Sequence, residues 1–491
     1  MKKLLALVMT IALLASLVVI PAVAEEMPTI TMVYSGDNNP PDDNDIIVEL
    51  RNRLGVNLQI TYVSGGDYAT KLNTMMASDT LPDIIMNVSG QNLLDLVAAG
   101  KLLNWEPYLA EYGQNILAKT DVEDMKKAPA NKDGLYAGIS YGAQYHKTLS
   151  VRKDWLQAVG MEVPTNLDEY YEVMKAFTKN DPDGNGQDDT YGMAFGMSAN
   201  FWTGIFAGYG IPMSGWGQAI QLEDGTVTTV MKHPEFLNAM TYLNKLYQEG
   251  LVDPDFVNLT NMQCFEQLWN NKVGVLGWEA VGPTNNWYPG RYTFEVDPEP
   301  ANEFDFITLN GKSAWKIYPN YNSAAWCINA KCANPEAAVK VVDYMWYSEE
   351  GDELCYLGVE GKHFEWVDKD NGKYQRLGIY TDDTVQRAAG CWVYKGLFNT
   401  TNCEVRVMNA LTQKSLADAA AAAIEYPYIS AVLETRTEYG ADLDALVQEC
   451  FATMVVADGG LDTILADFIT RWEDEGGLDY EEEATAAYAA Q

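Results

Sequence analysis

Apolar runs and segments of helical periodicity alternate through the first hundred residues. We predict buried or alternating strands over Thr29–Tyr34, Val56–Val63 and Asp83–Val88. Between and after them, we predict helices over Ile46–Leu54 (capped by Asp45 and ended by Gly55), Asp67–Ser78 and Leu93–Ala99. Strand and helix alternating at these spacings predict βαβ units and a parallel sheet.

The later part of the chain continues both patterns. We predict strands over Gly134–Ser140, Thr148–Arg152 and Val273–Trp278. We predict one helix directly after a capping box formed by Thr165 and Asp168. Further predicted helices cover Pro234–Gly250, Phe265–Asn270, Pro335–Glu350 (ended by Gly351), Asp418–Ile424 and Leu443–Val456. The acidic tail, Asp474–Gln491, is expected to be a last turn and a frayed end. Because no low-complexity linker occurs, ordinary strands should cross between any lobes.

The first 24 residues have the parts of a secretion signal. Lys2 and Lys3 precede the apolar run Leu4–Ile20, and Ala22-Val23-Ala24 gives a cleavage site before Glu25. An uncleaved membrane anchor is the alternative, since the run is nearly long enough to span a bilayer. Glu25 stands where a lipid-modified cysteine would be, so lipid attachment there is excluded. We expect an exported, soluble protein that is extracellular, periplasmic or at the cell surface. The chain is too long for a single hydrophobic core, which suggests two lobes or domains.

Composition excludes several classes of partner and site. The net charge of −36, from 69 acidic and 33 basic residues, repels nucleic acid and anionic membranes. The seven cysteines all follow residue 263, their number is odd and they form no CxxC, while the three histidines are scattered. We therefore expect no zinc site and assign no disulfide.

An acidic loop in the segment NDPDGNGQDDTYG has the register of an EF-hand-type calcium loop. Oxygen ligands fall at positions 1, 3, 5, 7 (main-chain carbonyl) and 9: Asp181, Asp183, Asn185, Gln187 and Asp189. Gly186 occupies position 6, where the sharp turn needs glycine, but position 12 is Gly192 instead of the bidentate glutamate. We predict a structural calcium ion completed by water or a distant carboxylate; a solvated acidic turn is the alternative.

Several long segments together resemble one family. The most specific block is LSVRKDWLQAVGMEVPTNLDEYYEVMKAFTKNDPDGNGQDDTYG; others are TMVYSGD, LPDIIMNVSG, YLNKLYQEGLVDPDF, NPEAAVKVVDYMWYSEEGDEL and GVEGKHFEW. The chain resembles a family 1 extracellular solute-binding protein, the receptor of an ABC importer. The resemblance implies an α/β, type II periplasmic-binding-protein-like fold with two lobes. Each lobe would be a mixed, mainly parallel sheet flanked by helices, and strand crossovers would form a hinge.

The same resemblance implies an architecture and partners. Residues 25–145 and 311–375 would build the first lobe, residues 146–310 the second, and a mainly helical part, 376–491, would complete the second lobe and hinge. The ligand would be a carbohydrate, usually an oligosaccharide, clamped between the lobes and delivered to ABC transporter permease subunits by a monomer. Members from Gram-positive bacteria usually carry the lipoprotein cysteine, so Glu25 puts tethering in doubt.

A carbohydrate site needs flat aromatic rings and planar polar groups at the ends of strands. The aromatic candidates are Tyr34, Trp202, Tyr209, Trp278, Trp287 and Trp326, and the polar candidates are Asp37, Asn38, Gln91 and Glu279. Core packing is the alternative for each ring, and a solvated loop end for each polar group. Arg152 and Asp154 of the RKDWL block are interpreted first as a structural ion pair.

Two other classes of function remain open. A secreted glycoside hydrolase needs one placed pair of carboxylates, and 69 acidic residues supply such pairs by chance. The GxSxG of Gly138–Gly142 is followed by a predicted strand, whereas a nucleophile elbow needs a helix, so Ser140 is not expected to be catalytic. A secreted glycan sensor without import is the second alternative. We expect a binding protein, not an enzyme, whose lobes close on the ligand.

Overall fold

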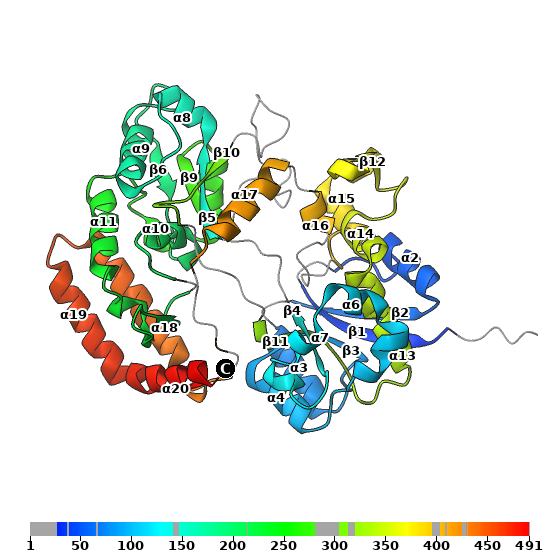
Figure 1. Ribbon diagram of the computed structural model, residues 1–491. Coiled ribbons are helices and arrows are strands. Elements are labelled where there is room, and N and C mark those ends of the chain that lie inside the picture. The colour runs from blue at the N-terminus through cyan, green and yellow to red at the C-terminus, as the bar shows by residue number, and fades with distance from the viewer. Residues whose placement is uncertain are drawn as a thin grey trace, which may run out of the picture.

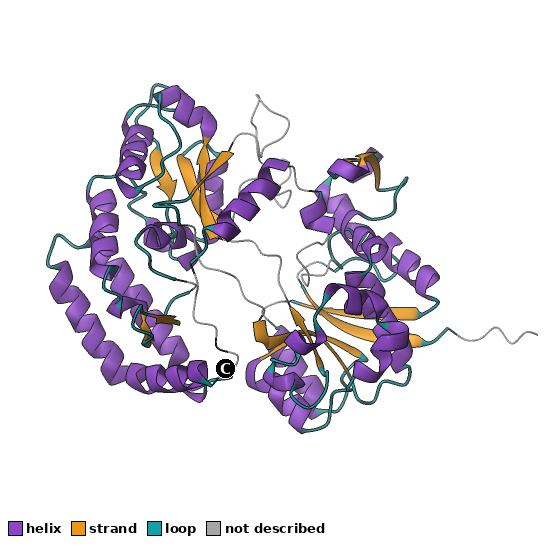
Figure 2. Ribbon diagram, viewed as in Figure 1, coloured by secondary structure: helices purple, strands orange, loops and turns teal. Residues whose placement is uncertain are grey.

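Two α/β lobes, each built around its own sheet, form the molecule (Figures 1 and 2). The structure is a computed structural model that describes residues 27–36, 39–64, 67–140, 147–213, 215–279, 304–312, 320–394, 403–407, 410–424, 429 and 431–490. The predicted signal, residues 1–24, lies outside the described residues.

The sheet of the first lobe has the strand order β2-β1-β3-β11-β4. Its strands are β1 (Thr29–Ser35), β2 (Asn57–Val63), β3 (Ile84–Ser89), β4 (Ala137–Ser140) and β11 (Asn320–Ile328). The pairs of β1 with β2 and with β3 are parallel, as the alternation of strands and helices predicts, whereas β11 runs antiparallel to β3 and β4. The connecting helices are α2 (Asp45–Leu54), α3 (Tyr68–Ala77) and α4 (Gly90–Ala98).

The sheet of the second lobe has the order β10-β5-β9-β6. Its strands are β5 (Lys147–Arg152), β6 (Tyr191–Ala194), β9 (Val273–Glu279) and β10 (Phe304–Ile307). β5 pairs antiparallel with β10 and β9, and β9 pairs parallel with β6. Both sheets are therefore mixed, and the chain crosses between them from β4 to β5 and again from β10 to β11.

Helices cover both sheets, and two hairpins lie outside them. The helices of the first lobe are α5 (Leu109–Tyr112), α6 (Gln114–Lys119), α7 (Val122–Met125), α13 (Pro335–Val342), α14 (Glu349–Leu357), α15 (Asp383–Ala388) and α16 (Cys403–Arg406). The remaining helices are α8 (Lys153–Val159), α9 (Leu167–Lys179), α10 (Thr203–Gly208), α11 (Phe236–Gln248), α12 (Asn261–Trp269), α17 (Ala410–Ala421), α18 (Glu434–Val456), α19 (Leu461–Trp472) and α20 (Leu478–Ala489). The hairpins are β7 (Ala219–Gln221) with β8 (Val227–Thr229), and β12 (Phe364–Asp368) with β13 (Lys373–Arg376).

Two predicted helix caps are wrong by one residue. Asn44, not Asp45, caps α2, because its side-chain oxygen accepts the amides of Ile46 and Ile47 at 3.2 and 3.1 Å. At α9 the cap is Asn166, which accepts the amide of Glu169 at 2.9 Å. Asparagine competes well at both positions because its carbonyl reaches the free amides of the first turn.

The predicted helix from Pro335 to Glu350 is wrong in its end. α13 passes into a π-helical turn, Asp343–Tyr347, and α14 then runs through Gly351 to Leu357. Gly351 is needed for close packing and not for termination, since a Cβ there would lie 1.9 Å from the carbonyl oxygen of Tyr344. Gly358, at φ 97°, follows the last helical residue.

The acidic tail is also ordered, contrary to the expected frayed end. α20 buries Tyr480 and Ala484 against the second lobe. The Tyr480 hydroxyl accepts the amide of Ala219, 3.0 Å away on β7. Glu481 accepts hydrogen bonds from the Thr228 hydroxyl at 2.6 Å and the Trp472 indole at 2.9 Å. Ala219 and Thr228 are distant from the tail in sequence, so the charge pattern of the tail alone could not reveal these contacts.

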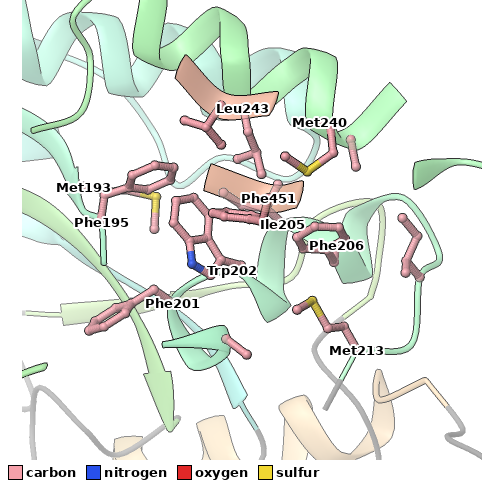
Figure 3. Close-up of a cluster of buried hydrophobic side chains, with 14 of the residues drawn as sticks. Met193, Phe195, Phe201, Trp202, Ile205, Phe206, Met213, Met240, Leu243 and Phe451 are labelled. Carbon is pink, nitrogen blue, oxygen red and sulfur yellow. The ribbon is translucent and has the colours of Figure 1, made fainter. Parts of the chain in front are cut away.

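Each lobe has its own hydrophobic core. The core of the second lobe gathers residues of the sheet, of α9–α12 and of the C-terminal helices. Figure 3 shows its centre, where Phe451 of α18 packs on Trp202 with ring centroids 4.3 Å apart. The core of the first lobe combines residues 30–139 with residues 324–394. The described part of the chain contains no helix long and apolar enough to span a membrane.

Candidate functional site

The carboxyl ends of β1, β2 and β3 meet at one edge of the first sheet. In Figure 1, β1 (blue) runs from the outer side of its lobe toward the second lobe, so this edge faces the region between the lobes. Open α/β sheets bind ligands at such edges. The edge presents Tyr34 near the end of β1, Tyr62 near the end of β2, and Gln91 at the beginning of α4.

Three tyrosines form a cluster at this edge. The rings of Tyr34 and Tyr62 are half-buried, and each lies with its centroid within 6.4 Å of the fully buried ring of Tyr394. The hydroxyls of Tyr62 and Tyr394 are hydrogen-bonded, and the Asn44 amide donates to the Tyr394 hydroxyl at 2.7 Å. Burial raises the pKa of Tyr394 to about 12 and also raises the pKa of Tyr34 and of Tyr62. All three groups are therefore neutral hydroxyls at physiological pH.

Sequence reasoning named Tyr34 as a candidate but did not name Tyr62 or Tyr394, which the fold places beside it. The alternation in VNLQITYV places Tyr62 near the end of its strand, which is the signal that could have identified it. Tyr394 had no such signal, because it follows α15 and reaches the edge only through the tertiary fold.

At the second lobe, Trp278 and Glu279 end β9, as predicted. The Trp278 ring is half-buried and packs on Phe201 and Phe265, with centroid distances of 5.2 and 5.1 Å. The Trp278 side chain is thus partly exposed, and two aromatic neighbours restrict its orientation. An aromatic ring held in this way loses little freedom when a ligand stacks on it.

Two aromatic candidates are corrected to core residues. Trp202 and Trp326 are both 0% exposed. The indole of Trp202 donates to the Gly196 carbonyl at 2.7 Å, and the indole of Trp326 donates to the Tyr347 hydroxyl at 3.2 Å. With faces and indole N–H groups enclosed, neither ring has surface to offer a ligand. Their Gly-rich surroundings reflect close packing: a Cβ on Gly138 would meet Trp326 at 2.1 Å.

The other candidates have less defined places. Tyr209 is half-buried just after α10 and lies edge-on to Tyr242 at 6.2 Å, which favours packing within the second lobe. Gln91 is exposed, and its amide donates to the Asp95 carboxylate at 2.8 Å. Asp37, Asn38 and Trp287 lie outside the described residues. The GxSxG serine, Ser140, ends β4, and the next described element is β5.

The RKDWL block forms the structural ion pair expected. Arg152, 4% exposed, makes a two-pronged contact with Asp154, and its Nε lies 3.0 Å from Oδ1. Its third nitrogen donates to Asn271 at 2.6 Å, and the guanidinium lies 4.6 Å from the centre of the Trp155 ring. The pair fixes the turn from β5 into α8, directly after the chain enters the second lobe.

The acidic loop folds around the side chain of Asp181. Its carboxylate accepts the amides of Asn185 and Gly186 at 3.0 and 2.9 Å. The side-chain amide nitrogen of Asn185 lies 2.8 Å from an oxygen of Asp183 and 3.2 Å from an oxygen of Asp189. The predicted ligand side chains at positions 1, 3, 5 and 9 therefore converge. The main chain of Gln187 also belongs to the loop, since its amide donates to Asn185 Oδ1 at 2.7 Å.

The electrostatics of the loop favour a cation. Burial and the neighbouring Asp181 raise the pKa of Asp183, because two carboxyl groups crowd one place. Within the described residues, His, Cys, Asp and Glu side chains alone form no group of three arranged to hold a metal. A bound ion would also need the Asn185 amide oxygen, the Gln187 carbonyl and water. This all-oxygen set fits calcium and not zinc.

The cysteines provide no second site. All seven are free thiols, six of them buried. Burial raises the pKa of the Cys264 and Cys450 thiols to about 12, so these two groups are unreactive packing residues.

Two α/β lobes with separate sheets and separate cores, between which the chain crosses more than once, are the architecture of a two-lobed binding protein. The family of bacterial extracellular solute-binding proteins matches residues 51–351, more than half of the chain. The chain belongs to this family.

Relatives and solved structures agree with the family. Lipoprotein LipO of Bacillus subtilis (strain 168) is 24% identical over 464 residues, covering 89% of this chain and 88% of that protein. The polygalacturonan/rhamnogalacturonan-binding protein YtcQ of the same organism is 29% identical over 255 residues, covering 50% and 48%. The Streptococcus pneumoniae substrate-binding protein FusA in complex with kestose has a TM-score of 0.70 at 18% identity, covering 94% of this chain and 99% of that one. The two-lobed fold predicted from the sequence is confirmed.

Proposed function

We propose that this protein is exported, captures an oligosaccharide between its two lobes and delivers it to an ABC importer. The observation that carries the proposal is the pair of aromatic sheet edges on a fold of this family. Tyr34 and Tyr62 stand at the edge of the first lobe and Trp278 ends a strand of the second. Aromatic faces pack on the C–H faces of sugars, and neutral hydroxyls pair with sugar hydroxyls. Relatives named for carbohydrate ligands, such as YtcQ and FusA, support this ligand class.

The mechanism is closure of the lobes about the crossing strands. The lobes have separate hydrophobic cores, so each lobe can rotate relative to the other as a rigid body. A ligand that touches both edges shifts the population toward the closed form by its differential affinity for the two forms. The closed form would then present a surface for the permease subunits, and the receptor would act as a monomer without catalytic turnover.

Calcium is proposed as a structural ion of the second lobe. The loop residues Asp181, Asp183, Asn185 and Asp189 would hold it, with the Gln187 carbonyl and water. The ion would supply charge compensation and fix the connection from α9 to β6. Among proteins of the same fold, an EF-hand mutant of FusA and an alginate-binding protein without calcium ion have been solved. We expect EDTA to lower the melting temperature clearly and to change the affinity for glycan only slightly. An unchanged melting temperature would contradict a structural ion.

The experiment that tests the binding function is a screen of soluble oligosaccharides by thermal shift, followed by calorimetry on each stabilising glycan. Trp278→Ala should weaken binding about tenfold or more, as loss of a central aromatic contact does. Trp366→Ala is the control, because Trp366 is a half-buried tryptophan on the separate β12–β13 hairpin. If Trp278→Ala leaves the glycan affinity unchanged, the end of β9 does not belong to the binding site. A broad screen without any stabilising glycan would count against the ligand class.

Closure is tested by small-angle scattering with and without saturating glycan. The radius of gyration should fall on binding, and an unchanged value would contradict hinge closure. A secreted glycan sensor would close in the same way, so import needs its own test: transport into vesicles that contain the permease. Product analysis of the glycan after prolonged incubation should find no hydrolysis, and cleavage lost on mutating one acidic pair would favour the hydrolase.

A further inference from the structure

Lys272 lies at the point where the acidic loop meets the sheet of the second lobe. It directly precedes β9, and its carbonyl accepts the amide of Tyr191, the first residue of β6, at 2.8 Å. Its own amide donates to the Gln267 carbonyl at 2.8 Å. The backbone of Lys272 is therefore fixed on both sides, and its side chain starts from a defined position.

The side chain of Lys272 reaches into the loop. Its ammonium pairs with Oδ2 of Asp189, the predicted ligand at position 9, while the amide nitrogen of Asn185 lies 3.2 Å from Oδ1 of the same carboxylate. Asn185 also donates to Asp183 at 2.8 Å. Two donors of the protein thus occupy carboxylate oxygens that a calcium ion would claim.

We propose that Lys272 is an internal counter-ion of the calcium loop, which holds Asp189 in the metal-free protein and yields it when calcium binds. This inference rests on the proposed calcium site. Lys272 thereby sets the calcium affinity of the loop, because the ion must displace an ammonium that is already paired. Asn185 would have to present its amide oxygen to the ion in place of the nitrogen that contacts Asp183 and Asp189.

The charges determine the sign of the effect. The loop carries four carboxylates, three of which belong to the predicted ligands Asp181, Asp183 and Asp189, and Lys272 compensates one of these within contact distance. Without Lys272 the metal-free loop keeps its repulsion and the divalent ion meets a more negative site, so both changes favour binding. Lys272 therefore stabilises the metal-free protein at the expense of calcium affinity. It also directly precedes β9, whose last two residues are Trp278 and Glu279, so the exchange takes place at the base of a strand that reaches the proposed binding edge.

The test compares Lys272→Met with Lys179→Met in the full-length protein. Lys179 is exposed in the last turn of α9, two residues before Asp181, so its removal makes the same charge change near the loop away from the β9 side. Calorimetry with calcium chloride on chelator-treated protein should give a dissociation constant about fivefold to tenfold lower for Lys272→Met than for the wild type. Lys179→Met should change it by about twofold at most. Lys272→Arg, which keeps the charge, should stay near the wild-type value.

Thermal melts supply the second readout. In EDTA, Lys272→Met should melt about 1–3 °C below the wild type, and saturating calcium should remove the difference. Equal calcium constants for Lys272→Met and the wild type, or equal gains for Lys272→Met and Lys179→Met, would overturn the exchange. A wild-type protein that binds no calcium would overturn both the site and the exchange. It would leave the proposed carbohydrate function standing, since glycan binding is measured separately in EDTA.

Discussion

Gly138 of β4 provides a direct test of how the first lobe is packed. A Cβ at this position would lie 2.1 Å from Cε2 and 2.2 Å from Nε1 of Trp326, more than an ångström inside ordinary contact. Trp326 cannot retreat easily, because it is 0% exposed, its ring lies 4.6 Å from that of Trp105, and its indole donates to Tyr347 at 3.2 Å. Gly138→Ala must therefore shift either the strand or the indole.

The cost follows from these contacts. Overpacking a closed core costs about 1–3 kcal/mol, and loss of the hydrogen bond from Trp326 to Tyr347 adds about 1 kcal/mol. We expect Gly138→Ala to lower the free energy of unfolding by about 3 kcal/mol. With a slope of about 3 kcal/mol per molar urea for a chain of this size, the unfolding midpoint falls by about 1 M.

The assay is equilibrium unfolding in urea, followed by tryptophan fluorescence. Gly36→Ala is the matched control, because a Cβ there meets only the ring of Tyr34 at an ordinary 3.6 Å. In the double variant Gly138→Ala/Trp326→Phe the smaller ring makes room, so the two costs should fall short of additivity by 1 kcal/mol or more. The reasoning is refuted if Gly138→Ala is within about 0.5 kcal/mol of Gly36→Ala.

Three further predictions concern charged groups. Asp154→Asn leaves the guanidinium of Arg152 without its carboxylate. Because the Asp154 side chain is 36% exposed, we expect the free energy of unfolding in urea to fall by about 2 kcal/mol, less than for a fully buried pair. A decrease below about 0.5 kcal/mol would contradict the structural role of the pair. Burial lowers the pKa of His363, so below about pH 6.5 the unfolded chain binds a proton that the folded protein does not, and the free energy of unfolding decreases as the pH falls. Between pH 7.5 and 5.5 the melting temperature should therefore fall less in His363→Gln than in the wild type. Equal falls in the two proteins would refute the assignment. Glu481→Ala removes the acceptor of the Trp472 indole and should cost about 2 kcal/mol while making α20 sensitive to limited proteolysis, whereas an α20 as resistant as in the wild type would show that Glu481 does not hold it.

The chain pattern predicted local elements well where the local signal was strong. The three strands and intervening helices of residues 29–98 agree with the structure within a few residues, because apolar periodicity and glycine stops such as Gly55, at φ 65°, act locally. The prediction failed where a distant residue decided. Gly351 looks like a helix stop in the sequence, yet its lack of a side chain serves packing against Tyr344. The acidic tail became a docked helix because Ala219 and Thr228 supply partners from another part of the second lobe.

The candidate site shows the same division. The place of Trp278 near the end of β9 could be predicted, since the end of a Gly-containing strand is a local feature of VGVLGW. Trp202 and Trp326 were also predicted as candidates and are nevertheless 0% exposed, because burial depends on what packs from elsewhere, here Phe451 of α18 and Trp105. Tyr394 was invisible in the sequence for the same reason, since only the fold brings it to Tyr62.

The sequence by itself determined the family, most of the order of strands and helices, and the spacing of the oxygen-bearing residues in the acidic loop. These properties depend on residues close together in the chain, where periodicity, caps and loop register act. Only the tertiary structure decided which aromatic rings are core and which stand at a sheet edge, and that Lys272 pairs with Asp189 across 83 positions. Burial and charge pairing depend on which residues are close in space, and for these side chains the close residues are distant in the sequence.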